Sequence, residues 1–317
     1  MILDAETLEP AAAVDVLVRG AESLDLPGAL KTELHAHVVE LTTDICADVD
    51  EAIGALRELR TAAARIAGDN GLVLAAAGAH PAAALLLLPV VQEERYVEMV
   101  ERLGYVAQRQ GVNGLHVHVG VESADRCWER LEAVLPWLPV VLALSANSPF
   151  IEGRATGMLS NRALILAELP RGGATPSFDG YEAWEAWVER LVRLGVMPDY
   201  TRVWWDARPN PRLGTLELRI ADQPTALERT GVIVRLLRDL VADAAGSHAP
   251  RADYLQNRWA AARSGLDALL LHPDGEQIVP ARDLARELLG AEPPEPEAHA
   301  QLAADDVVAD LVARTVG

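Results

Sequence analysis

The stretch GLHVHVGV, residues 114–121, alternates with a period of two and is bounded by glycine. This pattern predicts a β-strand with one apolar and one polar face. The stretch TLELRI, residues 215–220, predicts a second strand of the same kind. Around these two strands, periodicity and flanking residues predict further helices and strands. The predicted helices are 48–67, 92–110, 124–144 with interruptions at Pro136 and Pro139, 181–194, 227–245, 257–271 and 297–313; the predicted strands are 71–77 and 202–206; and 145–178 is expected to be mostly loop with a helical turn near 162–168.

The composition is that of a globular protein with a sizeable core, since half of the 317 residues are hydrophobic and 24% are charged. The net charge of -19, without a run of Lys or Arg, argues against nucleic acid and anionic membranes as partners. A bound cation and a few arginines would still allow a nucleotide. The acidic N-terminal residues and short apolar runs predict a cytoplasmic protein without a signal peptide or membrane span. Cys46 and Cys127 are expected to be reduced structural thiols.

Two histidines lie on the first predicted strand. His116 and His118 are two residues apart, so both imidazoles leave the same face of a sheet, where they can share a metal or phosphate. An isolated H-x-H pair is equally compatible with one structural and one exposed histidine. The residues around the pair are therefore needed to distinguish a shared metal or phosphate site from a structural pair.

The second predicted strand has a charged face. Its alternation places Thr215, Glu217 and Arg219 on one side, which we expect to line a cavity. Just upstream, RPNPR places Arg208 and Arg212 on a proline-stiffened loop. Three guanidiniums within a dozen residues suit the oxygens of a polyphosphate, whereas plain solubility charges would be less closely tied to the start of a strand.

A third group of polar residues lies near the N-terminus. The stretch TELHAHVVELTTD, residues 32–44, contains Glu33 and Glu40 with His35 and His37 between them. An uninterrupted strand would place the two glutamates on opposite faces, so a bulge or bend is needed if both bind in one site. Carboxylates in this apolar context predict a divalent-cation site, and a half-exposed edge strand is the alternative.

Several common catalytic motifs are missing from the sequence. It has no G-x-x-x-x-G-K-[ST] loop, no G-x-S-x-G elbow and no C-x-x-C pair. Lys31 is the only lysine and lacks a glycine-rich context. A P-loop nucleotide fold is therefore excluded.

Four ordered motifs resemble the carboxylate-amine ligase branch of glutamate-cysteine ligase family 2. They are GLHVHVGV, LALSANSPFIEGRATGMLSNR, DYTRVWWDARPNPRLGTLELRIAD and NRWAAARSGLD, and the resemblance runs from Glu33 to about Gly265. It implies an α+β fold similar to glutamine synthetase, with a curved, mainly antiparallel sheet and helices packed on its outer face. It also implies that the concave face holds ATP and Mg²⁺ or Mn²⁺.

The resemblance further implies a reaction and a set of site residues. ATP would phosphorylate the γ-carboxylate of glutamate, and an amine such as that of cysteine would attack the acyl phosphate to give a γ-glutamyl amide. Arginines and metal would neutralise charge during phosphoryl transfer. The implied metal ligands are Glu33, Glu40, His116 and Glu217; the implied catalytic residues are Arg208, Arg212 and Arg219; and the implied cofactor-binding residues are His116, His118, Arg154, Arg208 and Arg212.

The length of the chain favours one catalytic domain at 1–290, and the residues after Gly290 predict an acidic Pro-rich connector and a helix at 291–317. The family begins with a strand carrying Gly-x-Glu-x-Glu, whereas this sequence begins Met1-Ile2-Leu3-Asp4, inside or just after that strand. The N-terminal strand and its metal-binding glutamates are therefore expected to be missing. A homodimer is also compatible with the resemblance. Two other functions are considered: a catalytically impaired relative that binds nucleotide or amino acid as a regulator, and a metal-dependent hydrolase.

Overall fold

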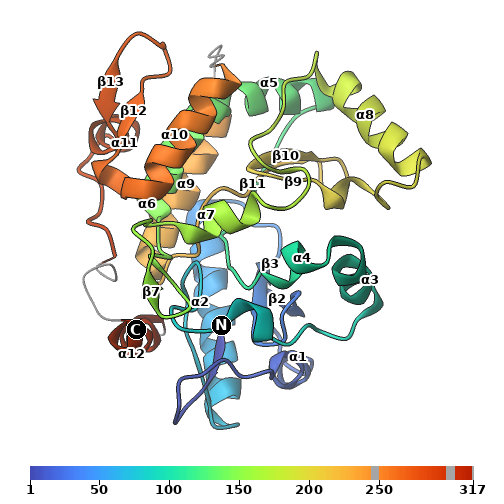
Figure 1. Cartoon of the computed structure of the whole chain (residues 1–317), viewed down its shortest axis with the longest axis vertical. Coiled ribbons are helices and arrows are strands. Elements are labelled where there is room, and N and C mark those ends of the chain that lie inside the picture. The colour runs from blue at the N-terminus through green and yellow to red at the C-terminus, as the bar shows by residue number, and fades with distance from the viewer. Residues whose placement is uncertain (244–249, 298–303, 316–317) are drawn as a thin grey trace.

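Helices and strands are mixed along the whole chain (Figure 1). The computed structural model describes residues 1–243, 250–297 and 304–315. The helices are α1 Val14–Ala21, α2 Val49–Gly68, α3 Glu94–Leu103, α4 Tyr105–Gln108, α5 Ala124–Val134, α6 Leu138–Ser145, α7 Asn161–Leu166, α8 Tyr181–Arg193, α9 Leu227–Asp243, α10 Arg251–Ser264, α11 Ala281–Leu289 and α12 Ala304–Thr315. The strands are β1 Ile2–Asp4, β2 Gly28–Thr32, β3 Val39–Thr43, β4 Leu72–Leu74, β5 Val117–Gly120, β6 Phe150–Ile151, β7 Arg154–Ala155, β8 Gly172–Gly173, β9 Trp204–Trp205, β10 Ala207–Asn210, β11 Thr215–Leu218, β12 Leu269–Leu271 and β13 Ile278–Pro280.

The strands form several small sheets. Within the described residues, β10, β11 and β5 form one antiparallel three-stranded sheet, and the other named strands pair two by two, β8 with β9 in parallel and the rest antiparallel. Backbone bonds from Ile2 to His37 and from Asn113 to Gly78 connect neighbouring sheets. The mixed α and β content is as predicted, but one continuous curved sheet is not confirmed.

The alternation of β11 sets the position of the largest core. Leu216, Leu218 and Ile220 are at most 1% exposed and pack in one cluster with residues of α5, α6, α9, α10 and α11. This apolar face of the strand is covered by helices, as the sequence predicted. Because side chains alternate along a strand, the opposite face is left to Thr215 and Glu217.

Most of the predicted helices are present, with local differences. The segment 92–110 is divided at Gly104, whose φ of 58° ends α3 before α4 begins. The two prolines divide 124–144 into α5, a 3-10 turn and α6. The segment 257–271 was wrong at both ends, since α10 begins at Arg251 and the last residues form β12.

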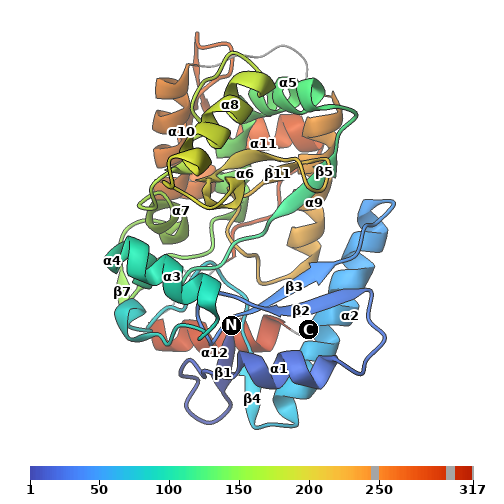
Figure 2. The same ribbon diagram turned by 90° about the vertical axis from the view of Figure 1, so that its right-hand side faces the viewer.

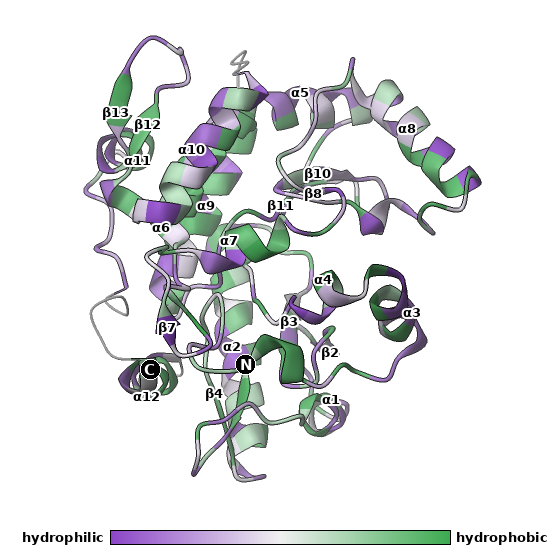
Figure 3. Ribbon diagram, in the orientation of Figure 1, coloured by the Kyte–Doolittle hydropathy of each residue, from purple (hydrophilic) through white to green (hydrophobic). Residues whose placement is uncertain are grey.

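Capping and amphipathicity account for several helices. Asp48 and Ser123 cap α2 and α5 by accepting backbone N–H bonds from the first turn. Figure 3 shows hydrophilic and hydrophobic residues alternating around α8, and apolar residues along β12 and β13. No helix in the described ranges is both long and apolar enough to cross a membrane.

The last helix packs against the first strands. Val307, Val308 and Leu311 of α12 share a buried cluster with Leu3 and Phe150, and α12 lies near β1 in Figure 2. Of the predicted helix at 297–313, residues 298–303 lie outside the described residues, as do 244 and 245 of the helix predicted at 227–245. The part of the connector that is described, 291–297, includes the buried Glu297.

Candidate functional site

The polar face of the β10–β11–β5 sheet brings several predicted site residues together. The antiparallel register places Glu217 directly opposite His118 of β5 and Arg208 of β10. His118 Nε2 lies 4.0 Å from a Glu217 carboxylate oxygen, and its Nδ1 lies 3.0 Å from the Thr215 hydroxyl. The β10–β11 hairpin and β5, which is distant from it in sequence, thus present one carboxylate, an imidazole and a guanidinium to the same space.

Arg208 is fixed by the protein itself. Its Nε and Nη2 donate to the two Glu217 oxygens at 2.8 and 3.2 Å, and its Nη1 donates to the backbone carbonyls of Thr201 and Val203. The side chain is only 6% exposed. The prediction that Arg208 lies on a loop was wrong, because Arg208 lies within strand β10. Its guanidinium group is held by Glu217 of the neighbouring strand.

Arg219 holds the other side of Glu217 and is less completely paired. Its Nη1 donates to Glu217 and lies 3.4 Å from His116 Nδ1. Its buried Nε has no hydrogen-bond partner among the described residues. Burial alone would raise the pKa of Glu217, but Arg219 and Arg208 hold that pKa well below its ordinary range. Glu217 is therefore ionised, and one buried donor of Arg219 is left without a partner among the described residues.

The two histidines are accessible to solvent although protein surrounds them closely. Both are exposed. Desolvation by the surrounding protein, followed by the cationic Arg219, lowers the pKa of His116 well below its usual value. Desolvation also lowers the pKa of His118, against the opposing effect of Glu217. Both rings are therefore neutral at pH 7, the form that binds metal.

Glu33 and Glu40 are brought together by a turn. The chain leaves β2 at Thr32, reverses with a hydrogen bond from Val38 N to His35 O, and returns as β3, which contains Glu40. The expected bulge or bend in one strand is thus a reversal between two strands. Burial raises the pKa of Glu40, and the charge of Glu33 raises it further, while Lys31, Arg219 and Arg95 lower it. The electrostatic effect of Arg219 relates this hairpin to the polar face of β11.

The histidines between these glutamates have a different position. His35 and His37 are at most 1% exposed, and their ring centroids are 5.9 Å apart. They point into the interior at the turn. We therefore assign them to the core and not to the polar face.

Two of the predicted cofactor-binding arginines lie elsewhere. Arg212 is exposed in the turn between β10 and β11. Arg154 is exposed in β7, which pairs with β6 and lies apart from β11 in both Figure 1 and Figure 2. Arg154 is thus not brought to the sheet that presents Glu217 and Arg219.

The donor set suits a hard cation that is completed by phosphate oxygens. Among the described residues, no three His, Cys, Asp or Glu side chains are close enough to hold one metal ion. Mg²⁺ commonly uses one or two protein carboxylates and takes its other ligands from water and substrate phosphates. Glu33 and Glu40 fit that role, since Glu40 is a partly buried carboxylate with a raised pKa. Glu217 is already paired with two arginines.

Many of the polar motif residues build the frame of the site. Asp222 is fully buried and accepts hydrogen bonds from Asn147 N, Ser148 Oγ and Ser160 Oγ at 2.7 to 2.9 Å. Burial raises its pKa, and Arg162 opposes that effect. This network ties the loop after α6 to the end of β11. Asp222 was not predicted as a functional residue, although its position two residues beyond the TLELRI strand was a usable signal.

A second buried network holds the start of β10. Asp206 accepts hydrogen bonds from Arg258 Nε and from the Tyr254 hydroxyl, both at 2.7 Å. Its backbone carbonyl accepts from Arg219 N. The Trp-Trp-Asp motif thereby connects α10 with the strand that presents Arg219. Its residues position the site without lining it.

Close approach explains one glycine beside the site. A Cβ at Gly114 would lie 2.2 Å from Nη2 of Arg162. The Arg162 guanidinium is buried and donates to Ile220 O at 2.9 Å. Only glycine leaves room for this arginine beneath the start of β5.

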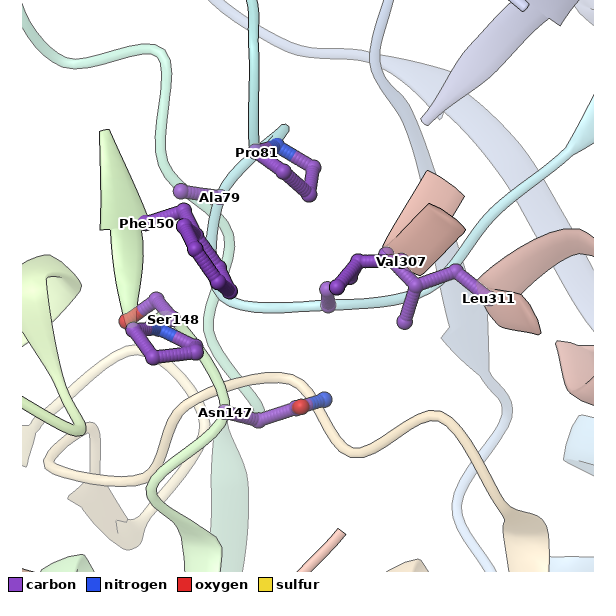
Figure 4. A pocket seen from close by; sticks show the side chains of 9 residues that line it. Ala79, Pro81, Asn147, Ser148, Phe150, Val307 and Leu311 are labelled. Carbon is purple, nitrogen blue, oxygen red and sulfur yellow. The ribbon is translucent and has the colours of Figure 1, made fainter. Parts of the chain in front are cut away.

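Two hollows of the structure lie away from the polar face. A cavity of about 10 Å³, room for about one water, lies where Val307 and Leu311 of α12 face Ala79 and Phe150 (Figure 4). A more open depression of about 360 Å³ is lined by residues of 149–159 and 263–267. Neither hollow is lined by a residue of β5, β10 or β11. The candidate site is therefore defined by its side chains, and neither of these two hollows is part of it.

Comparison with known proteins agrees with these features. The family model described as glutamate-cysteine ligase family 2 matches residues 2–312. A Rubrobacter xylanophilus relative provisionally named glutamate–cysteine ligase 2-1 is 39% identical over 291 residues, which are 90% of this chain and 77% of that protein. The protein named glutamate–cysteine ligase from Haloferax volcanii is 37% identical over 289 residues, 88% of this chain and 80% of that protein.

A solved structure shares the fold. The bifunctional glutathione synthetase of Pasteurella multocida matches with a TM-score of 0.57 at 15% identity, covering 90% of this chain and 45% of that longer one. At this identity the likeness concerns the fold alone. The match to the family model over nearly the whole sequence, together with the two relatives, shows that the chain belongs to glutamate-cysteine ligase family 2.

Proposed function

We propose that this protein is an ATP- and Mg²⁺-dependent carboxylate-amine ligase that joins the γ-carboxylate of glutamate to an amine such as that of cysteine. The observation that carries the proposal is the polar face of β11, where Arg219, Glu217 and His116 meet in a member of a ligase family. The buried Nε of Arg219 has no partner among the described residues. It is a donor suited to a phosphate or acyl-phosphate oxygen.

Each residue has a role that follows from its contacts. Arg219 binds the anion, and Arg208 holds Glu217 so that the carboxylate in turn orients Arg219. Glu33 and Glu40 hold the divalent cation, which neutralises phosphate charge when bound. The neutral His116 and His118 supply imidazole nitrogens beside the anion. Arg212, at the exposed turn, is assigned to the entrance of the site.

The proposed reaction is balanced without a further reactant. A carboxylate oxygen of glutamate attacks the γ-phosphorus of ATP, and ADP leaves. The amine nitrogen then attacks the acyl carbon, the C–O bond to phosphate breaks, and the amine proton is lost. The products are the amide, ADP and phosphate in equal amounts.

The test measures these products directly. The protein is incubated with glutamate, MgATP and a panel of amines that includes cysteine; ADP is followed by a coupled assay and the amide by mass spectrometry. We expect amide and ADP in equal amounts, dependent on both amine and Mg²⁺. An Arg219→Met variant should lose most of the activity, while Arg57→Met, which removes an exposed cation from α2, should keep it. ATP binding without turnover for every amine would refute the ligase and favour a noncatalytic relative.

A further inference from the structure

The only lysine of the chain lies on the face of the β2–β3 hairpin that carries Glu40. Lys31 in β2 pairs directly with Glu40 in β3, so both side chains leave the same face. Leu30, the neighbour of Lys31, is 6% exposed and packs in a cluster with Leu17 of α1 and Leu59 of α2. The helices therefore cover the other face, and Lys31 is exposed on the face that they leave open.

The open face of this hairpin is directed towards the proposed site. The carboxyl group of Glu40 is influenced by the charges of Glu33, Lys31, Arg219 and Arg95 together. Figure 1 and Figure 2 both place β2 and β3 below β11, and Figure 2 also places them below β5. Lys31 and Arg219 thus approach the carboxylate of Glu40 from different elements.

The ammonium of Lys31 is available for a ligand. Arg208 is paired with Glu217, and Arg95 donates to Glu93 and to the Thr32 hydroxyl. Lys31 is exposed, and among the described residues its side chain interacts with the charge of Glu40 without forming a hydrogen bond or a close ion pair. In a protein with a net charge of -19, an anion needs local cations. A compact ammonium on a flexible stem is well suited to a phosphate group.

The geometry points to Lys31 as a phosphate-binding residue that contacts the polyphosphate of the nucleotide from the β2–β3 side, opposite Arg219. This inference rests on the proposed function, because it assumes that a nucleotide enters between the hairpin and β11. Lys31 would bind the negative oxygens and at the same time screen Glu33 from Glu40. It transfers no proton and forms no covalent bond.

A lysine that occurs once in the sequence allows a test that does not depend on turnover. The intact protein is acetylated with the sulfosuccinimidyl ester of acetic acid, and modification of Lys31 is followed by peptide mass spectrometry. The reaction is run alone, with glutamate, and with the nonhydrolysable analogue AMP-PNP and Mg²⁺. We expect the nucleotide to slow the modification about tenfold or more, as a charge-assisted hydrogen bond of ordinary strength would, and glutamate to slow it little.

Variants provide the second measurement. Lys31→Met should raise the KM for ATP about tenfold or more while the KM for glutamate changes little, and Lys31→Arg should restore part of the loss. Arg57→Met is the control for removal of one exposed cation. If Lys31→Met does not fold, acylation of the wild-type protein still decides the question.

The outcomes separate this inference from the proposed function. If calorimetry shows that AMP-PNP binds and Lys31 reacts equally fast in its presence, Lys31 is not a phosphate contact, although the ligase proposal stands. An unchanged KM for ATP in Lys31→Met leads to the same conclusion. If the wild-type protein neither binds AMP-PNP nor releases ADP, both are overturned.

Discussion

Replacement of Glu217 by glutamine should destabilise the protein strongly. The carboxylate is 2% exposed and is shared by two buried guanidiniums, Arg208 and Arg219. Arg208 would keep its carbonyl partners at Thr201 and Val203, but Arg219 would keep only His116. Breaking a buried ion pair from one side costs roughly 3–5 kcal/mol. Because the glutamine oxygen can still accept one bond, we expect a loss of about 3 kcal/mol in the free energy of unfolding.

The assay is urea unfolding at several pH values. Variants are compared where the free energy of unfolding depends on urea concentration with the same slope. Burial opposes ionisation of Glu217, but Arg219 and Arg208 lower its pKa below the ordinary 4.5. The stabilisation is thus complete above that pH and is lost as the pH falls through the folded-state pKa. Glu129→Gln is the matched control, since Glu129 and its partner Arg126 have side chains 60% exposed and such pairs contribute below about 1 kcal/mol. A loss below about 1 kcal/mol for Glu217→Gln at pH 7, or one that grows in acid, would refute the reasoning.

Three further predictions follow from local geometry. Gly114→Ala should lower the unfolding free energy by roughly 1–3 kcal/mol, because its Cβ would displace the buried Arg162; an unchanged urea midpoint would contradict this. Thiol titration at pH 8 should detect one reactive cysteine, Cys46, because burial raises the pKa of Cys127 to about 12; rapid reaction of both thiols without denaturant would show the packing to be wrong. Glu40→Gln should raise the thermal midpoint of the ligand-free protein at pH 7 but not at pH 4, since burial and Glu33 raise the pKa of Glu40 and its ionised form disfavours the fold; equal midpoints at pH 7 would contradict this.

The sequence predicted the polar face of β11 because strand geometry is local. The period of two alone places Glu217 and Thr215 opposite Leu216 and Leu218, and the burial of the leucines follows it. The same holds for α2, whose capping residue Asp48 and apolar stripe are both visible in the sequence.

What the sequence could not predict depends on how segments of the chain pair with one another. The antiparallel register of β10 against β11 converts Arg208 from an expected loop residue into a buried partner of Glu217. The turn at His35 to Val38 brings Glu33 close to Glu40, but it contains no glycine or proline from which a turn could be predicted. Arg258, which donates to Asp206, lies on a separate helix, α10. Such pairings follow from the tertiary fold and leave no local pattern.

The contacts of α12 have a consequence for synthesis in the cell. The Thr315 hydroxyl accepts a hydrogen bond from the amide of Ala76, a residue 239 positions earlier, and Arg60 donates to the carbonyl of Thr315. During translation, β1 and β4 emerge long before the helix that covers Leu3 and Ala75. The side of this apolar strand pair that α12 covers is therefore exposed in the nascent chain until α12 has been synthesised, and we expect chaperones that bind exposed hydrophobic segments to bind it in that interval.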